Sequence, residues 1–200
     1  MELRERPVQL QGSALARAAL RLAGWRIRFD GLPARQGVVI VYPHTSNWDF
    51  VIGVLAKWGI GIPVTFWGKE SLFRVPLLGL WLRWLGGVPV DRSAANGIVG
   101  QMVEALNAAR RDGRFLWLAL APEGTRRLTD AWRSGFYHVT HGAQVPLALA
   151  FFDFGRREVG VEHFLMLSGN RNVDMASIAR RYGTRVGLRP QRAAPIRLQP

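Results

Sequence analysis

The sequence predicts an α/β fold: a single domain built on a mixed sheet with helices on both faces. Its 200 residues, 48% of them hydrophobic, suit one packed core. Short runs of β-forming residues alternate with helix-like segments for much of the chain, which is typical of α/β proteins. Titratable or charged residues follow several of the apolar runs within one or two positions, so we expect functional groups where strands end.

The expected strands are short runs rich in β-branched and aromatic residues, each bounded by turn residues. They cover residues 38–42, 62–67, 87–90, 115–121, 145–152 and 159–167.

Two helices stand out by their hydrophobic period. Residues 96–111 carry an apolar stripe at i, i+3, i+4 and i+7, and Gly113 follows to end the helix. This stripe, which we expect in the core, is Val99, Met102, Val103 and Leu106. Ser13 is placed to cap another helix that continues to about Trp25. The apolar face of this helix is expected to pack on the domain or to lie on lipid, and consists of Leu15, Ala18, Ala19 and Leu22.

No internal repeat, low-complexity tract or convincing linker divides the chain before its last thirty residues. We therefore expect residues 1–200 to form one domain, with residues 1–36 as a helical lead-in. Residues 171–200 are rich in arginine and contain one acid, Asp174. This C-terminal end is expected to be a basic surface or tail.

The chain is strongly basic, with 27 Lys and Arg against 14 Asp and Glu and a formal net charge of +13. Arginine supplies 25 of the 27 cations, and its guanidinium suits bidentate contacts with phosphate and carboxylate. An anionic partner is expected: nucleic acid, an anionic membrane surface or a phosphorylated substrate, which overall charge does not separate. A GC-rich genome, which favours arginine codons, is the alternative explanation of the bias.

The absence of cysteine excludes disulfides, thiolate metal sites and catalysis by a cysteine thiol. The charged N-terminus lacks the apolar region of a signal peptide, and no run reaches the roughly 18 uncharged apolar residues of a membrane-spanning helix. Between residues 57 and 84, however, tryptophan and phenylalanine alternate with lysine and arginine, a mixture that suits either a core or a membrane interface. We therefore expect a cytoplasmic protein, held peripherally on the inner face of the cytoplasmic membrane.

One apolar run stops at Pro43 and is followed by His44 and Asp49. On one continuous helix, side chains five positions apart would point about 140° apart. If instead a strand ends at Pro43 and a helix capped by Ser46 or Asn47 begins after it, the two side chains converge. The carboxylate then holds one imidazole nitrogen, and the other nitrogen can accept a proton from a substrate hydroxyl as a general base. The alternatives are a structural histidine and an aspartate that only caps the helix.

A second charged loop follows the run 115–121. Its glycine allows close backbone approach, and its threonine and arginine supply donors suited to a phosphate. The loop residues are Glu123, Gly124, Thr125 and Arg126. A further charged pair, Asp91 and Arg92, follows the run 87–90. Because the chain has neither a G-x-S-x-G elbow nor a cysteine, the nucleophile is expected to come from the substrate.

In their order along the chain, these residues resemble the motifs of the glycerophospholipid acyltransferase family, whose type member makes phosphatidic acid from lysophosphatidic acid. The family's H-x4-D motif matches His44 and Asp49, and its E-G-T-R block matches residues 123–126. Its glycine-x-apolar-x-basic block matches residues 87–92, and its V-P-apolar block matches residues 145–147. The resemblance covers roughly residues 38–152.

The resemblance implies an enzyme that moves a fatty acyl group from acyl-CoA or acyl carrier protein to a hydroxyl of a lysophospholipid such as 1-acyl-glycerol-3-phosphate. The active site would lie at strand-to-helix turns, with His44 as general base and Asp49 as its partner. The residues implied to bind or organise the acceptor's phosphate are Arg92, Glu123, Gly124, Thr125 and Arg126. Neither a metal nor a dissociable cofactor is implied. A phosphate-free acceptor such as a lyso-ornithine lipid is the alternative, because Arg126 can equally hold a carboxylate.

Other functional classes fit the sequence less well. A nucleic-acid-binding protein would explain the charge, but the sequence shows no zinc-ligand spacing, RRM signature or helix-turn-helix pattern, so we expect no nucleic-acid partner. A metal site would use His44, Asp49, His138 and His141, since histidines at i and i+3 share a helix face. Such histidines, and His163, are more often structural. A lipid-binding protein with a decayed site is disfavoured because both charged motifs are intact.

Overall fold

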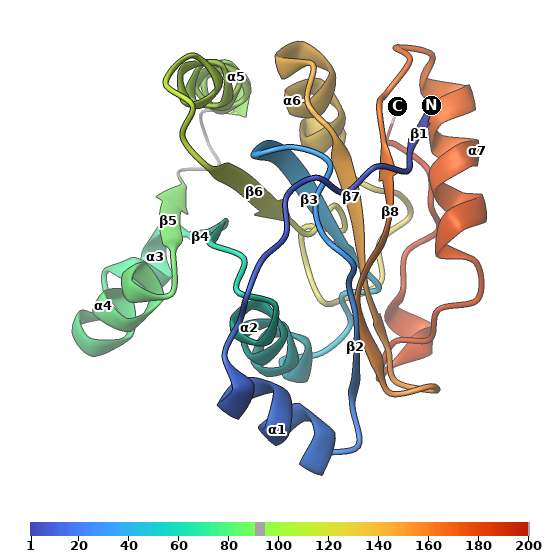
Figure 1. The fold of residues 1–200 in the computed structure, drawn as a ribbon. Helices are drawn as coiled ribbons and strands as arrows, with labels where there is room; N and C mark the ends of the chain where they lie inside the picture. Colours follow the sequence, from blue (N-terminus) through green and yellow to red (C-terminus); the bar gives the residue numbers. More distant parts are fainter. Residues whose placement is uncertain (91–94, 200) are drawn as a thin grey trace.

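The computed structural model describes residues 1–90 and 95–199, and in them one sheet of eight strands runs through the molecule (Figure 1). The strands are β1 (Glu2–Leu3), β2 (Arg26–Arg28), β3 (Gln36–Tyr42), β4 (Val64–Lys69), β5 (Gly87–Val90), β6 (Leu116–Leu120), β7 (Leu147–Asp153) and β8 (Glu158–Leu165). Their order is β1-β8-β7-β3-β6-β4-β5, and β2 also pairs with β8. All neighbours are parallel except β7 with β8 and β1 with β8. The predicted mixed sheet is confirmed, and each predicted strand is found within about two residues of its expected bounds.

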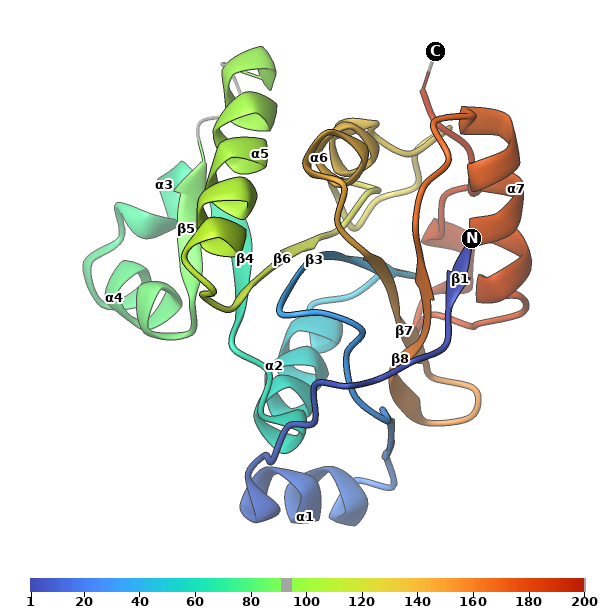
Figure 2. The same ribbon diagram turned by 45° about the horizontal axis from the view of Figure 1, so that its top comes forward.

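Helices cover both faces of the sheet, as predicted. They are α1 (Ala14–Leu22), α2 (Trp48–Ile60), α3 (Glu70–Phe73), α4 (Pro76–Trp84), α5 (Ala95–Arg111), α6 (Gly135–Ala143) and α7 (Arg171–Tyr182). One face carries α1 and α2, and the other carries α5, α6 and α7 (Figures 1 and 2). The short helices α3 and α4 lie beside β4 and β5 at one edge of the sheet.

The two-sided cover follows from the alternation of side chains along each strand. On β3, Val38 and Ile40 pack into the core shared with α5, α6 and α7. Val39, between them, packs on the opposite face. Both faces of the strand are therefore buried. This explains its unbroken apolar run, which is typical of a central parallel strand.

The two predicted helices are present. In α5, Met102 and Leu106 are buried in the core, as the stripe predicted. The hydroxyl of Ser13 accepts a hydrogen bond of 3.3 Å from the Ala16 N–H and so caps α1. The residues that α1 buries are Ala16 and Leu20, and most of the apolar face read from the sequence is turned to solvent, with Leu15 and Leu22 exposed.

Both ends of the chain are part of the packed fold. Residues 1–36 contribute β1 and β2 to the sheet as well as α1, and strands of two and three residues are too short for hydrophobic alternation to reveal. Helix α7 buries Met175, Ile178 and Tyr182 against the sheet. The backbone after it returns to the strand ends, so residues 171–199 form a packed surface and not a tail. Searched over the described ranges, the helices include none with the length and hydrophobicity needed to cross a bilayer.

Candidate active site

The turn after β3 converts a buried strand into a helix, as the sequence predicted. Helix α2 begins at Trp48, and Asn47 makes no side-chain capping bond. Capping is done by Ser46 and Asp49: the Asp49 carboxylate accepts from the Ser46 N–H at 2.8 Å, and the Ser46 hydroxyl accepts from the Trp48 N–H at 3.2 Å. This S-x-x-D pattern resembles a capping box and fixes where Asp49 lies.

His44 and Asp49 converge in this turn. The Nδ1 atom of His44 lies 3.3 Å from Oδ2 of Asp49. The Asp49 side chain is fully buried, whereas 18% of the His44 side chain is exposed. Nδ1 of His44 and Oδ1 of Asp49 are both buried and lack a well-angled hydrogen-bond partner among the described residues. The predicted proximity is confirmed, and since Nδ1 faces inward, a substrate can reach only the other side of the ring.

Glu123 joins this turn to the loop after the neighbouring strand. Because β3 and β6 are adjacent and parallel, their carboxyl ends lie at the same edge of the sheet. One Glu123 carboxylate oxygen accepts from the backbone N–H of His44 at 2.6 Å, and the other accepts from the N–H of Ala194 at 2.9 Å. The residue is only 2% exposed. Burial raises the pKa of Glu123, although the two N–H hydrogen bonds oppose that shift. The carboxylate thus organises the backbone of the site.

Gly124 and Thr125 shape the next part of the loop. Gly124 has φ of +68°, in the left-handed region that favours glycine. A Cβ atom at this position would lie 2.7 Å from Nε of Arg133, so the Arg133 side chain uses the space that glycine leaves. The hydroxyl of Thr125 accepts from the Arg127 N–H at 3.3 Å.

Arg126 reaches from this loop back to the His44 turn. Its Nε donates to the backbone carbonyl of Ser46 at 3.1 Å, which fixes the guanidinium beside the first turn of α2. The ion pairs of the described residues do not include Arg126, and Glu123 faces backbone donors instead. A partly exposed guanidinium that forms no ion pair with a described residue suits a phosphate or a carboxylate.

One motif block lies only partly within the described residues, and another lies at the opposite end of the sheet. Arg92, predicted to bind the acceptor, and Asp91 beside it lie outside the described residues. The V-P-apolar block begins β7 at the opposite end of the sheet, where Val38 pairs with Leu147 and the Val38 N–H donates to the Pro146 carbonyl. That block serves strand pairing.

The C-terminal segment completes the site, and sequence reasoning missed it. The buried hydroxyl of Thr45 accepts from the Arg189 N–H at 3.2 Å, and Tyr42 donates to the Ala194 carbonyl at 3.1 Å. Burial, with a smaller contribution from the charge of Glu123, raises the pKa of Tyr42. These contacts use backbone groups of the C-terminal segment, which leave no residue-type signal in the sequence.

The histidines outside the turn do not form a metal site in the structure. Within residues 1–90 and 95–199, no three His, Cys, Asp or Glu side chains are grouped so that they could hold a metal ion. His138 and His141 lie on α6, where the His141 ring stacks on Tyr137. His163 pairs with Glu2 at 2.8 Å. These contacts fit structural roles.

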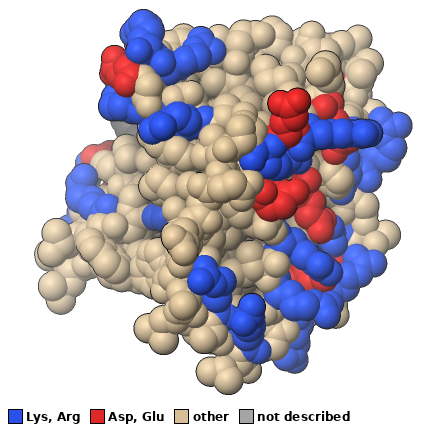
Figure 3. Space-filling view, viewed as in Figure 1, with Lys and Arg blue, Asp and Glu red and all other residues tan. Residues whose placement is uncertain are grey.

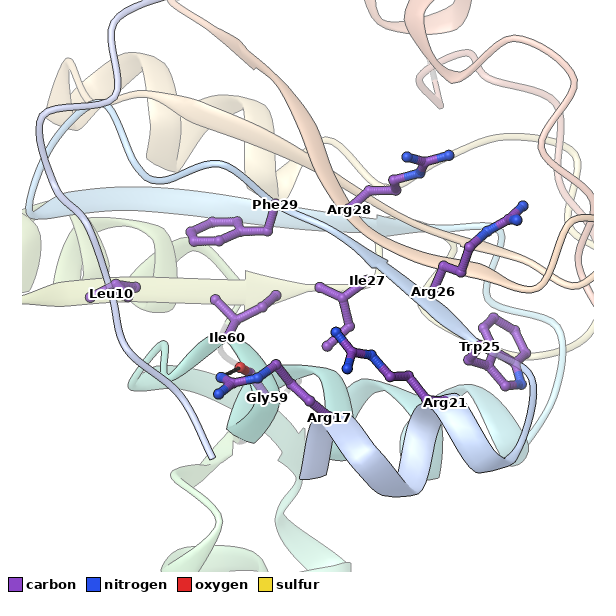
Figure 4. Close-up of a pocket in the computed structure, with 10 residues that line it drawn as sticks. All are labelled: Leu10, Arg17, Arg21, Trp25, Arg26, Ile27, Arg28, Phe29, Gly59 and Ile60. Carbon is purple, nitrogen blue, oxygen red and sulfur yellow. Dashed lines mark hydrogen bonds between the residues drawn. The ribbon is translucent and has the colours of Figure 1, made fainter. Parts of the chain in front are cut away.

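A separate pocket of 490 Å³ lies between α1, β2 and the C-terminal end of α2 (Figure 4). Arg17 and Arg21 extend from α1 over Ile27 and Ile60. None of the predicted site residues line it. It is therefore distinct from the turn that holds His44.

The sequence of this chain is similar to those of two named acyltransferases. The chain is 27% identical over 120 residues to a 1-acyl-sn-glycerol-3-phosphate acyltransferase of Saccharomyces cerevisiae. The aligned region covers 57% of this chain and 38% of the yeast protein. The chain is also 27% identical over 139 residues to a protein of the same name from Borreliella burgdorferi, covering 68% of this chain and 51% of the relative. The chain thus spans about half the length of these relatives or less.

The fold is similar to the crystal structure of the 1-acyl-sn-glycerophosphate acyltransferase PlsC from Thermotoga maritima. The TM-score is 0.53 at 16% sequence identity, and the match covers 83% of this chain and 74% of the PlsC chain. The sequence profile of the Acyltransferase family matches residues 26–149, which include the H-x4-D turn and the E-G-T-R loop. The chain therefore belongs to the acyltransferase family.

Proposed function

We propose that this chain transfers a fatty acyl group from a thioester, acyl-CoA or acyl carrier protein, to a hydroxyl of a lysophospholipid such as 1-acyl-glycerol-3-phosphate. The observation that carries the proposal is the approach of His44 to the buried Asp49 at the strand ends, with Arg126 fixed beside them. Membership of the acyltransferase family supports the reaction class. The lysophospholipid acceptor is supported by the names of the relatives and by the Arg126 guanidinium, which forms no ion pair with another described residue.

In the proposed reaction His44 acts as the general base. Asp49 holds Nδ1 and stabilises the imidazolium, and the other ring nitrogen removes the proton from the acceptor hydroxyl. The acceptor oxygen attacks the thioester carbonyl, a C–O bond forms, and the C–S bond breaks. The proton returns from the imidazolium to the leaving thiolate, so the products are an ester and a free thiol. The chain needs no nucleophile of its own.

The other site residues have binding and positioning roles in this proposal. Arg126, together with Arg92, grips the acceptor's anionic group. Gly124 and Thr125 give the loop the backbone shape that keeps Arg126 beside the His44 turn. Glu123 is a positioning residue that holds the His44 backbone through a 2.6 Å hydrogen bond. Residues 1–200 act as one acyltransferase domain, peripherally bound to the inner face of the cytoplasmic membrane.

Mass spectrometry of lipid products tests the proposal. The purified protein is incubated with acyl-CoA or acyl carrier protein thioester and a panel of lysolipids, including 1-acyl-glycerol-3-phosphate and lyso-ornithine lipid. We expect a diacyl product from the phosphate-bearing acceptor and none with His44→Ala. A product from lyso-ornithine lipid alone would reassign the acceptor to a phosphate-free lipid. Equal product from His44→Ala and the wild type would remove His44 as the base.

A further inference from the structure

Helix α4 turns its apolar stripe outward. Its exposed apolar residues are spaced i, i+3, i+4 and i+7, a pattern that in a soluble protein normally marks the side facing the core. They are Leu77, Leu80, Trp81 and Trp84. The side facing the protein carries Gly79 and Leu82 instead. Leu77 is 85% exposed and Trp84 is 71% exposed, so much of the stripe is open to solvent even though Trp81 and Trp84 touch rings of α2 at one edge.

Two further helices extend this stripe into one surface. The exposed large apolar residues of α2 are Trp48, Val51 and Trp58, and those of α1 are Leu15 and Leu22. We call these five residues and the α4 stripe the apolar outer face. The rings of Trp58 and Trp84 lie 5.7 Å apart, and the backbone N–H of Ser13 donates to the Trp58 carbonyl at 2.8 Å. In both ribbon views α1 and α4 lie beside α2, and the space-filling view shows a largely uncharged area over α3 and α4 (Figure 3).

Cations border the apolar outer face. Arg83 lies within α4, and Arg21 projects from α1 into the pocket of Figure 4. The exposed acid in α3, Glu70, is already paired with Arg74 at 2.9 Å. Tryptophan and leucine bordered by arginine suit the boundary between lipid headgroups and acyl chains.

We propose that the apolar outer face docks this chain onto a lipid bilayer that contains anionic headgroups. Leu77, Leu80 and the tryptophans enter the boundary of the acyl chains, while Arg21 and Arg83 contact headgroup phosphates. A second copy of the chain is the less suitable occupant, because at +13 two copies would bring like charges together. An anionic bilayer complements that charge.

The position of Trp48 connects docking with the proposed acyl transfer, on which this part of the inference rests. Trp48 precedes Asp49 in the first turn of α2, so the apolar outer face begins at the candidate active site. Farther along α2, the half-buried Lys57 donates to the Leu85 carbonyl and ties the helix to the end of α4. A lysolipid can therefore pass from the bilayer to His44 along α2.

Vesicle co-sedimentation tests the docking without any substrate. With vesicles of phosphatidylcholine alone, which isolate the apolar contribution, we expect Leu77→Glu/Leu80→Glu to lower the partition coefficient about tenfold or more. The matched control is Val173→Glu, at an exposed apolar position on α7, which should bind as the wild type does. Adding phosphatidylglycerol to the vesicles should raise the partition coefficient of the wild type. On these vesicles Arg21→Gln should lower the partition coefficient about fivefold, and the control Arg180→Gln on α7 should lower it less. Circular dichroism and Tm check that each variant is folded.

Two results would overturn the proposal. The first is unchanged vesicle binding by Leu77→Glu/Leu80→Glu. The second is a dimer in sedimentation velocity that this double variant converts to a monomer while vesicle binding is unaffected, which would make the face an interface between copies. His44→Ala should bind vesicles normally. A failure of docking is thereby distinguished from a failure of the proposed catalysis.

Discussion

Replacing Glu123 by glutamine separates a positioning role from the binding of the acceptor. In the structure the two carboxylate oxygens accept from the N–H groups of His44 and Ala194. A glutamine oxygen can keep one of these bonds, but the amide NH₂ then faces the second N–H, and two donors repel. The substitution preserves size and removes a charge, so it perturbs mainly these two bonds.

The expected loss follows from the hydrogen bonds. Losing one charge-assisted bond and leaving a buried N–H unsatisfied costs about 1.5–3 kcal/mol in the free energy of unfolding. In a 200-residue chain, 1 kcal/mol corresponds to about 2–4 °C in Tm. We therefore expect Tm to fall by roughly 3–12 °C. Because the His44 backbone is released, kcat should fall by about ten- to a hundredfold, while the acceptor KM changes little.

The pH dependence of stability gives a second readout of Glu123→Gln. Burial raises the pKa of Glu123 above 4.5, so the folded wild type binds this proton more tightly than the unfolded chain does. That contribution to stability is complete below the unfolded pKa and is lost as pH rises through the folded pKa. Glutamine does not titrate. The stability deficit of the variant is therefore expected to narrow as pH rises from about 4.5.

Thermal unfolding and steady-state kinetics with both substrates measure these effects. The matched control is Glu104→Gln on the surface of α5, where the lost ion pair with Arg111 is exposed and Tm should hardly change. A strongly raised acceptor KM with unchanged Tm would refute the reasoning. It would mean that Glu123 contacts the acceptor, as the motif resemblance allows.

Four further substitutions test the site and the packing around it. His44→Ala should abolish acyl transfer with the fold intact, and Asp49→Asn should lower kcat about a hundredfold. Both effects are measured by release of free thiol. Near-normal turnover in either variant would contradict the proposal that His44 and Asp49 act as a general base and its partner. Arg126→Ala should raise the acceptor KM roughly ten- to two-hundredfold and leave the thioester KM almost unchanged. If both KM values rise alike and Tm falls, Arg126 only stiffens its loop. Asp174→Asn should destabilise the protein by about 2–3 kcal/mol at neutral pH. Burial alone would raise the pKa of Asp174, but hydrogen bonds, chiefly from Ser168, hold it below 3.8. The stabilisation by Asp174 is therefore present above about pH 4 and is lost as the pH falls below it. Chemical unfolding at neutral pH and in acid should show that the free energies of unfolding of the wild type and the variant converge in acid.

The strands and the His44 turn could be predicted from sequence because their signals are local. A run of apolar residues ended by Pro43 marks the end of a strand, and the S-x-x-D spacing from Ser46 to Asp49 marks the start of a helix. These two boundaries are enough to make His44 and Asp49 converge. The neighbouring E-G-T-R loop could be placed at the same edge because parallel strands bring their carboxyl ends together.

The detailed role of Glu123 could not be predicted, because its partners are backbone N–H groups. Any residue except proline offers such a donor, so nothing in the identity of Ala194 indicates that it binds Glu123. The same holds for Arg189, whose N–H reaches Thr45. Long-range contacts of this kind need the fold before they can be seen.

The sequence also did not predict whether the apolar stripes of the helices face the protein core or the outside. Hydrophobic period identifies a stripe on α1 and α4 but does not say whether the stripe faces protein or lipid. In α1 the smaller residue Ala16 is buried with Leu20, because a small side chain lets the helix approach α2 closely, and the larger Leu15 and Leu22 remain outside.

The hydrogen bond from Ala194 to Glu123 also sets the order of events during synthesis. The His44 turn and the Glu123 loop leave the ribosome well before residue 194 does. Until that residue emerges and docks, the carboxylate lacks one of its two donors, and the His44 turn is held through one of the two hydrogen bonds only. The nascent chain therefore carries its histidine–aspartate pair before the second hydrogen bond that holds the Glu123 carboxylate can form.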